Sequence, residues 1–64
     1  MSVLNGKKMR DIREKRGMTP TQLAAAVGVS AQAINRFEAG AKDPSLRLLK
    51  IIAQVLCVNV SELM

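Results

Sequence analysis

Basic side chains dominate the chemistry that this chain of 64 residues can do. Ten Lys and Arg residues stand against five Asp and Glu residues, for a formal net charge of +5. Six of the ten lie within ten consecutive positions, at Lys7, Lys8, Arg10, Arg13, Lys15 and Arg16. Such a cluster indicates a polyanionic partner, with nucleic acid first and an anionic membrane surface second. The alternative for this segment alone is a solvated helix face in which neighbours such as Asp11 and Lys15 pair.

The residue types that carry most enzymatic chemistry are scarce. The chain has no His, which removes the usual proton shuttle and the commonest metal ligand. Its lone cysteine, Cys57, excludes an intrachain disulfide and a cysteine zinc site, and it indicates a reducing compartment. We therefore expect a cytoplasmic protein that is not an enzyme and that uses no metal and no cofactor.

Length and composition limit the architecture. A chain of 64 residues is expected to form one small domain, and its 48% hydrophobic content is enough for a compact core. No apolar run approaches the roughly 18 residues needed to cross a membrane, and the polar, basic start is unlike a signal peptide. Phe37 is the only aromatic residue, which argues against a membrane-surface helix and against base-stacking modules for single strands.

Gly and Pro residues divide the chain into short helical segments. Breaks fall at Gly17, Gly28, Gly40 and Asp43-Pro44, and no segment alternates with the period of two typical of strands. Thr19 and Gln22 can form a capping box around Pro20 at the first helical position. We predict five short helices and no sheet, over about 5–16, 20–27, 31–39 and 46–56, with a last turn between Asn59 and Met64.

Two of these helices, joined across Gly28-Val29-Ser30, have the pattern of a helix-turn-helix, whose second helix enters the major groove of DNA. The sequence resembles the phage repressor and Cro type of helix-turn-helix family from about Lys7 to Leu63. The matching motifs are Gln22-Leu23-Ala24, Gly28-Val29-Ser30, Ile34, Phe37-Glu38-Ala39-Gly40, Pro44-Ser45-Leu46 and Leu56-Cys57-Val58-Asn59-Val60 with Leu63. The resemblance implies a compact, all-α, lambda-repressor-like domain of five helices over residues 1–64, with the second and third helices as the helix-turn-helix.

The resemblance assigns base reading to the exposed face of the third helix, at Ala31, Gln32, Asn35 and Arg36. The side chains suit that role, because Gln32 can pair bidentately with adenine, Arg36 with guanine, and Ala31 can contact a thymine methyl. Asn35 can reach a base or a phosphate. Taken alone, Gln32 and Asn35 would be ordinary solvated helix surface.

Contacts to DNA phosphates are expected from helix ends and loops. The candidates are Thr21, Ser30, Ala39, Gly40 and Lys42. The resemblance also implies an internal ion pair between Arg13 and Glu38, which would tie the first helix to the end of the third. The alternative is two unrelated surface charges.

Two residues depart from the family pattern. Pro20 stands where the family often has Gln, whose backbone N–H donates to a phosphate, and proline has no N–H to donate. Cys57 stands where the family commonly has Gly, so Cys57 must accept a left-handed conformation or the helix must end differently. We expect the Cys57 side chain to be partly buried.

The fourth helix carries more apolar surface than one small domain easily covers. Its core face is expected at Leu46, Leu49, Ile52, Ala53 and Leu56. A second apolar stripe beside it is formed by Leu48, Ile51 and Val55. An exposed apolar stripe is typical of a partner surface. We therefore predict homodimer contacts at Leu48, Ile51, Val55, Val58 and Met64. The alternative is deeper packing of this stripe against Val3 and Leu4.

These features predict a transcriptional regulator that binds double-stranded DNA in a sequence-specific manner. We expect a repressor that acts as a homodimer on a palindromic operator. The alternative is an antitoxin-like module that binds and neutralises a partner protein, and the missing N–H at Pro20 favours that alternative slightly.

Overall fold

The computed structural model describes residues 3–64. In chain order they form α1 (Gly6–Lys15), α2 (Pro20–Val27), α3 (Ala31–Ala39), α4 (Leu46–Val55) and a 3-10 turn, η1 (Val60–Leu63). No strand occurs within these residues, which confirms the all-α class. The longest of the described helices have ten residues, about half the length that would cross a bilayer.

The last element corrects the expected count of five helices. It is a single 3-10 turn, so the described chain has four α-helices. Four residues are too few for a repeating i to i+4 pattern, and the N–H of Glu62 donates instead to the carbonyl of Asn59, three residues back, at 2.9 Å. The side chain of Glu62 also accepts from the N–H of Asn59 at 2.8 Å, which closes the turn on itself.

Side-chain caps begin the α-helices at the positions that the sequence signals. The Thr19 hydroxyl accepts from the N–H of Gln22 at 3.1 Å, and the Gln22 amide oxygen accepts from the N–H of Thr19 at 2.8 Å. The capping box ahead of α2 is therefore confirmed. The side chains of Asn5, Ser30 and Ser45 each accept from the backbone N–H three residues later, and they cap the starts of α1, α3 and α4.

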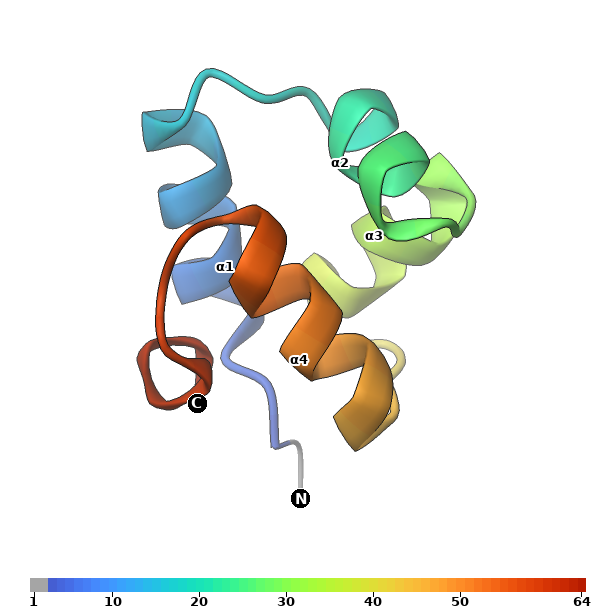
Figure 1. Ribbon diagram of the computed structural model, residues 1–64. Coiled ribbons are helices and arrows are strands. Elements are labelled where there is room, and N and C mark those ends of the chain that lie inside the picture. The colour runs from blue at the N-terminus through green and yellow to red at the C-terminus, as the bar shows by residue number, and fades with distance from the viewer. Residues whose placement is uncertain (1–2) are drawn as a thin grey trace.

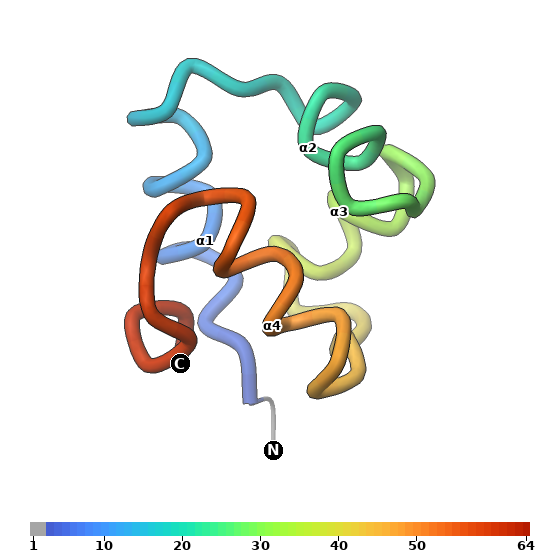
Figure 2. The backbone as a smooth tube through the Cα atoms, in the orientation of Figure 1, coloured from blue at the N-terminus to red at the C-terminus, as the bar shows by residue number. Residues whose placement is uncertain are grey.

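The helices pack around one apolar core. Figures 1 and 2 show α2 and α3 side by side at the upper right, with α1 at the left and α4 at the lower centre. α2 packs on α3 and α4, α1 packs on α3 and η1, and α4 also packs on η1. All five elements contribute to the core, whose fully buried side chains are Met9, Leu23, Ile34, Leu49, Ile52, Leu56 and Leu63. The N–H of Asn5 donates to the carbonyl of Leu63 at 2.6 Å, so η1 closes the fold against the start of α1.

Two side chains at the ends of α4, Leu46 and Cys57, are more exposed than expected from the sequence. The expectation that Leu46 lies in the core face is wrong: this first residue of α4 is 62% exposed, and the buried face begins at Leu49. Cys57 does adopt a left-handed conformation, with φ of 59°. Its side chain is exposed and not partly buried, since a residue in this conformation just after a helix turns away from the helix face.

Sequence reasoning missed a contact that caps α4 from α1. The guanidinium Nε of Arg16 donates to the carbonyl of Leu56 at 2.9 Å. The last carbonyls of a helix have no intrahelical partner and carry partial negative charge, so a cation there stabilises the helix end. Arg16 therefore joins the basic first helix to the core through α4.

Gly6, at the start of α1, lies directly against the end of α3. A Cβ atom added at Gly6 would stand 2.6 Å from the carbonyl oxygen of Phe37 and would also meet the carbonyl of Glu38. Real Cβ atoms do not approach backbone that closely, so only glycine lets α1 and α3 come this near.

This close approach predicts the sign of the stability change in Gly6→Ala. Helix propensity alone would make alanine more stable by about 1 kcal/mol. Overpacking against backbone that cannot move aside is instead expected to lower the free energy of unfolding by about 1–3 kcal/mol. Urea denaturation measures the change, with the exposed Lys8→Ala on the same helix as a control that should stay within about 0.5 kcal/mol of the parent. A more stable Gly6→Ala variant would contradict this packing.

Candidate nucleic-acid interface

Helix α3 presents a polar face to solvent because its apolar face is anchored in the core. Ile34 and Phe37 are buried, while Gln32, Asn35 and Arg36 are exposed. Gln32 and Arg36 are four residues apart and share one side of the helix. Ala31 is half-buried and packs against the core, so it adds a small apolar edge to this face.

The turn between α2 and α3 sets the angle at which that face is held. Gly28 has φ of 90°, a left-handed conformation that residues with side chains rarely adopt. Ala24 is buried at the crossing of the two helices, where a larger side chain would push them apart. The arrangement is that of a helix-turn-helix.

The predicted partners Arg13 and Glu38 come together beneath this face. Arg13 Nε lies 2.7 Å from Glu38 Oε2, and Arg13 Nη2 donates to Glu38 Oε1 at 3.2 Å. Arg13 Nη1 donates to the carbonyl of Met18 at 2.7 Å. The two side chains are only 7% and 8% exposed, and the hydrogen bond with Glu38 raises the pKa of Arg13 above its ordinary value. Arg13 thus holds α1, the loop before α2 and the end of α3 in one arrangement.

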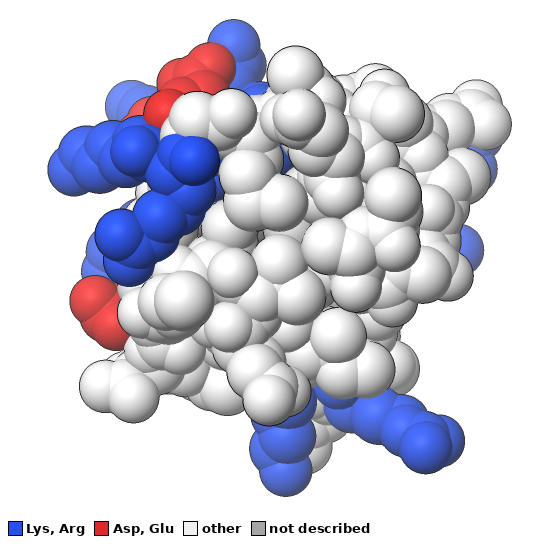
Figure 3. All heavy atoms as spheres, turned by 45° about the horizontal axis from the view of Figure 1, so that its top comes forward, with Lys and Arg blue, Asp and Glu red and all other residues white. Residues whose placement is uncertain are grey.

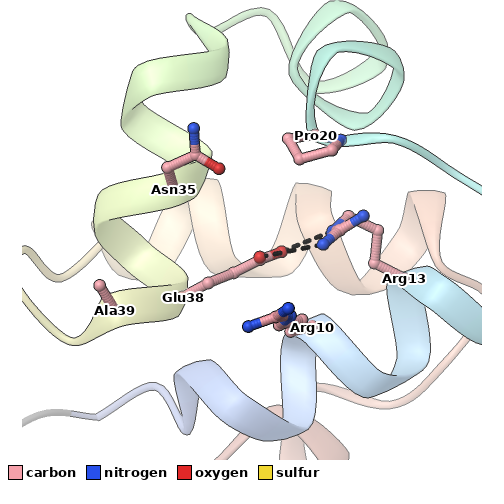
Figure 4. A pocket seen from close by; sticks show the side chains of 6 residues that line it. All are labelled: Arg10, Arg13, Pro20, Asn35, Glu38 and Ala39. Atoms are coloured by element: carbon pink, nitrogen blue, oxygen red, sulfur yellow. Dashed lines mark hydrogen bonds and ion pairs between the residues drawn. The ribbon is translucent and has the colours of Figure 1, made fainter.

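A pocket of about 320 Å³ opens beside the ion pair, between α1, α2 and α3. Figure 4 shows Asn35 reaching from α3 toward Pro20, with Arg10 below on α1. The residues that line it are Arg10, Arg13, Pro20, Asn35, Glu38 and Ala39. Asn35 therefore belongs to two surfaces, the outer side of α3 and the wall of this pocket.

The predicted phosphate contacts are all exposed, but they do not all offer a donor. The N–H of Gly40 donates to the carbonyl of Phe37 at 3.2 Å, as part of the cap of α3. The end of a helix also carries partial negative charge, which disfavours an anion at Ala39 and Gly40. The side chain of Lys42 and the first turn of α2 at Thr21 remain accessible. The Ser30 hydroxyl accepts from the N–H of Ala33 and keeps its own proton to donate.

Comparison with known proteins identifies the family. The sequence matches the helix-turn-helix family over residues 9–63. The chain belongs to this family. A relative from Archaeoglobus fulgidus, an uncharacterised HTH-type transcriptional regulator, is 41% identical over 56 residues, which cover 88% of this chain and 80% of the relative. The family consists of DNA-binding transcription regulators and is not a class of enzymes.

Solved structures of regulators have the same fold. The P22 c2 repressor in complex with a synthetic operator superposes with a TM-score of 0.86 at 28% identity, covering 91% of this chain and 88% of the repressor chain. The clp gene regulator ClgR from Corynebacterium glutamicum gives a TM-score of 0.85 at 32% identity and 89% coverage of this chain. This chain spans 61% of the ClgR chain. The phage-repressor resemblance inferred from sequence is confirmed.

The ion pair predicts a non-additive effect on stability. Arg13→Met or Glu38→Leu leaves one buried charge without its partner and is expected to lower the free energy of unfolding by about 3–5 kcal/mol. The double variant Arg13→Met, Glu38→Leu buries no lone charge, so it should be more stable than the sum of the single losses implies. Urea denaturation of the four proteins measures the coupling, and additive losses would show that the two side chains act separately.

Proposed function

We propose that this chain regulates transcription by placing α3 in the major groove of double-stranded DNA. The observation that carries the proposal is the set of exposed hydrogen-bonding side chains on α3, backed by the buried Ile34 and Phe37. Gln32 and Arg36 have the donor and acceptor groups that pair with adenine and guanine edges. Ala31 adds contact with a thymine methyl, and Asn35 lies at the edge of the same face. Residues 1–64 act as one helix-turn-helix domain.

Repression by occupancy is the mode that the relatives favour. The P22 c2 protein is a repressor whose structure is in complex with a synthetic operator, and the Archaeoglobus fulgidus relative is described as a transcriptional regulator. A repressor of this kind needs no catalysis, because a protein bound across a promoter blocks access to it. These relatives favour DNA binding over the antitoxin-like alternative.

Site selection from a random duplex pool at two salt concentrations tests this function. The expected product is an inverted repeat with half-site centres about one helical turn apart, retained at the higher salt. The Arg36→Ala variant should lose about 1–3 kcal/mol of binding free energy and relax one base position. Its control is Lys42→Ala, which should weaken binding to all sequences alike, since a phosphate contact carries no base information.

Two outcomes would contradict base reading. One is binding without enrichment of any sequence that disappears at the higher salt, which is phosphate attraction alone. The other is an equal loss of specific and random binding for Arg36→Ala.

The proposed operator requires two copies, and α4 supplies a surface for pairing them. Ile51 is 36% exposed and Met64 is 58% exposed, while Leu48, Val55 and Val58 are half-buried. Figure 3 shows a broad area without charged side chains over the α2 and α4 side of the molecule, with Lys and Arg at its edges. The N-terminal segment does not cover the whole stripe, because Leu4 is buried in the core while Ile51 stays exposed. Two copies are proposed to pair through this stripe.

A charge placed on the stripe should prevent pairing. Ile51→Glu is expected to sediment as a monomer at concentrations where the parent is a dimer, because pairing would bury the carboxylate without a partner. Leu46→Glu is the matched control, since Leu46 is exposed on the same helix but about 140° away from Ile51. It should leave the dimer intact. A parent protein that stays monomeric at high concentration and on DNA would contradict the dimer.

A further inference from the structure

The last turn of α3 rests on the first residue of α1. A Cβ atom added at Gly6 would lie 2.6 Å from the carbonyl oxygen of Phe37 and 2.7 Å from the carbonyl carbon of Glu38. The side chain of Glu38 is bonded to Arg13 of the same helix (Figure 4). Gly6 and Arg13 are seven residues apart and therefore lie on one side of α1. The end of α3 is thus held on α1 at two points, by backbone contact and by an ion pair.

Helix α1 is itself tied to the rest of the fold at both ends. The N–H of Asn5, just before α1, donates to the carbonyl of Leu63 at 2.6 Å. At the other end, Arg16 Nε donates to the carbonyl of Leu56 at 2.9 Å. Met9 lies between these two contacts and is fully buried. A change at Gly6 is therefore resisted by η1, by the end of α4 and by the core.

Helix α3 is held less evenly than α1. Its start is fixed against α2 by the left-handed turn at Gly28 and by the close crossing at Ala24. Its end continues into residues 40–45, most of which are exposed. This stretch can follow a shift of α3 without disturbing the core. A side chain at position 6 would therefore displace the end of α3 rather than its start or α1.

The two strongest base-reading candidates on α3 lie at different distances from this junction. Arg36 directly precedes Phe37, whose carbonyl meets Gly6. Gln32 lies five residues before Phe37, about 7.5 Å along the helix axis. A tilt of α3 about its start therefore moves Arg36 more than Gln32. Contacts of defined geometry require placement within about 0.5 Å, so a small tilt is enough to disturb a bidentate pair.

We infer that Gly6 is a positioning residue for DNA recognition. Because it has no side chain, the end of α3 settles where Arg36 can pair with its base. The inference rests on the proposed function, which places Arg36 against a base edge in the major groove. Gly6 itself contacts no DNA and acts only through α3.

Discrimination between bases in the selected DNA site tests the inference. Arg36→Ala and Gln32→Ala first identify the base position that depends on each side chain. Gly6→Ala should then lower discrimination at the Arg36 position at least about fivefold, the minimum expected for loss of a bidentate pair, and leave the Gln32 position nearly unchanged. Discrimination is a ratio of two affinities of one sample, so any unfolded fraction cancels, and sucrose raises the folded fraction.

Variants of Ile52 separate positioning from loss of stability. Ile52 is fully buried on α4, which packs on α2 and η1. Ile52→Val and Ile52→Ala are expected to bracket the stability loss of Gly6→Ala. Both should lower the midpoint of urea denaturation and keep the discrimination of the parent at both base positions.

Crystal structures of the parent and of Gly6→Ala without DNA give a second, independent measurement. After superposition on α2 and α4, the backbone of Phe37 and Glu38 should be displaced by about 0.4 Å or more, which is the step from 2.6 Å to the 3.0 Å below which real Cβ atoms are essentially never found. The first turn of α3 should stay in place. A structure in which α1 moves and the end of α3 does not would overturn the inference.

The binding outcomes distinguish this inference from the proposed function. If Gly6→Ala keeps both base positions, as the Ile52 variants should, Gly6 serves the fold alone and the inference is wrong while the function stands. Equal relaxation at the Gln32 and Arg36 positions would also contradict it, because the displacement would then not be confined to the end of α3. If the parent selects no site at all, the proposed function fails and the role of Gly6 in recognition fails with it, whatever the crystal structures show.

Discussion

The buried pair of Arg13 and Glu38 is the interaction on which the position of α3 depends. Burying two charges is unfavourable unless every donor and acceptor is satisfied, and here the guanidinium also bonds the carbonyl of Met18. These contacts join α1, the loop before α2 and the end of α3. Apolar packing at Ile34 and Phe37 would tolerate small rotations of α3, whereas directional hydrogen bonds do not. The outer face of α3 is therefore held at a defined angle to α1.

Local signals predicted most of the fold because this chain encodes its helix boundaries locally. The capping box at Thr19 and Gln22 and the left-handed Gly28 bound α2 at the residues expected from sequence. The exceptions depend on tertiary context. Periodicity places Leu46 on the core face of α4, but periodicity does not say at which residue of the helix that face becomes covered. A capping box at Asn59 indicates where a helix begins and not whether it continues beyond one turn.

The candidate site was predictable in residue types and less so in geometry. Exposure of Gln32 and Arg36 follows from the apolar period of α3, and the pairing of Arg13 with Glu38 came from the family resemblance. By contrast, the sequence did not predict that the N–H of Gly40 donates to the carbonyl of Phe37, because that bond depends on how α3 ends. Gly6 matters because two helices distant in sequence touch there, and no pattern around Gly6 signals that contact.

Stability and recognition are separated within this small domain. The side chains that hold α3 face inward, so the outer positions can change without disturbing the core. Pro20 affects both the stability of the fold and the hydrogen-bond donors at the surface. Its ring suits the first turn of α2 and reduces the freedom of the unfolded chain, which favours folding. The same ring removes a backbone donor beside the pocket.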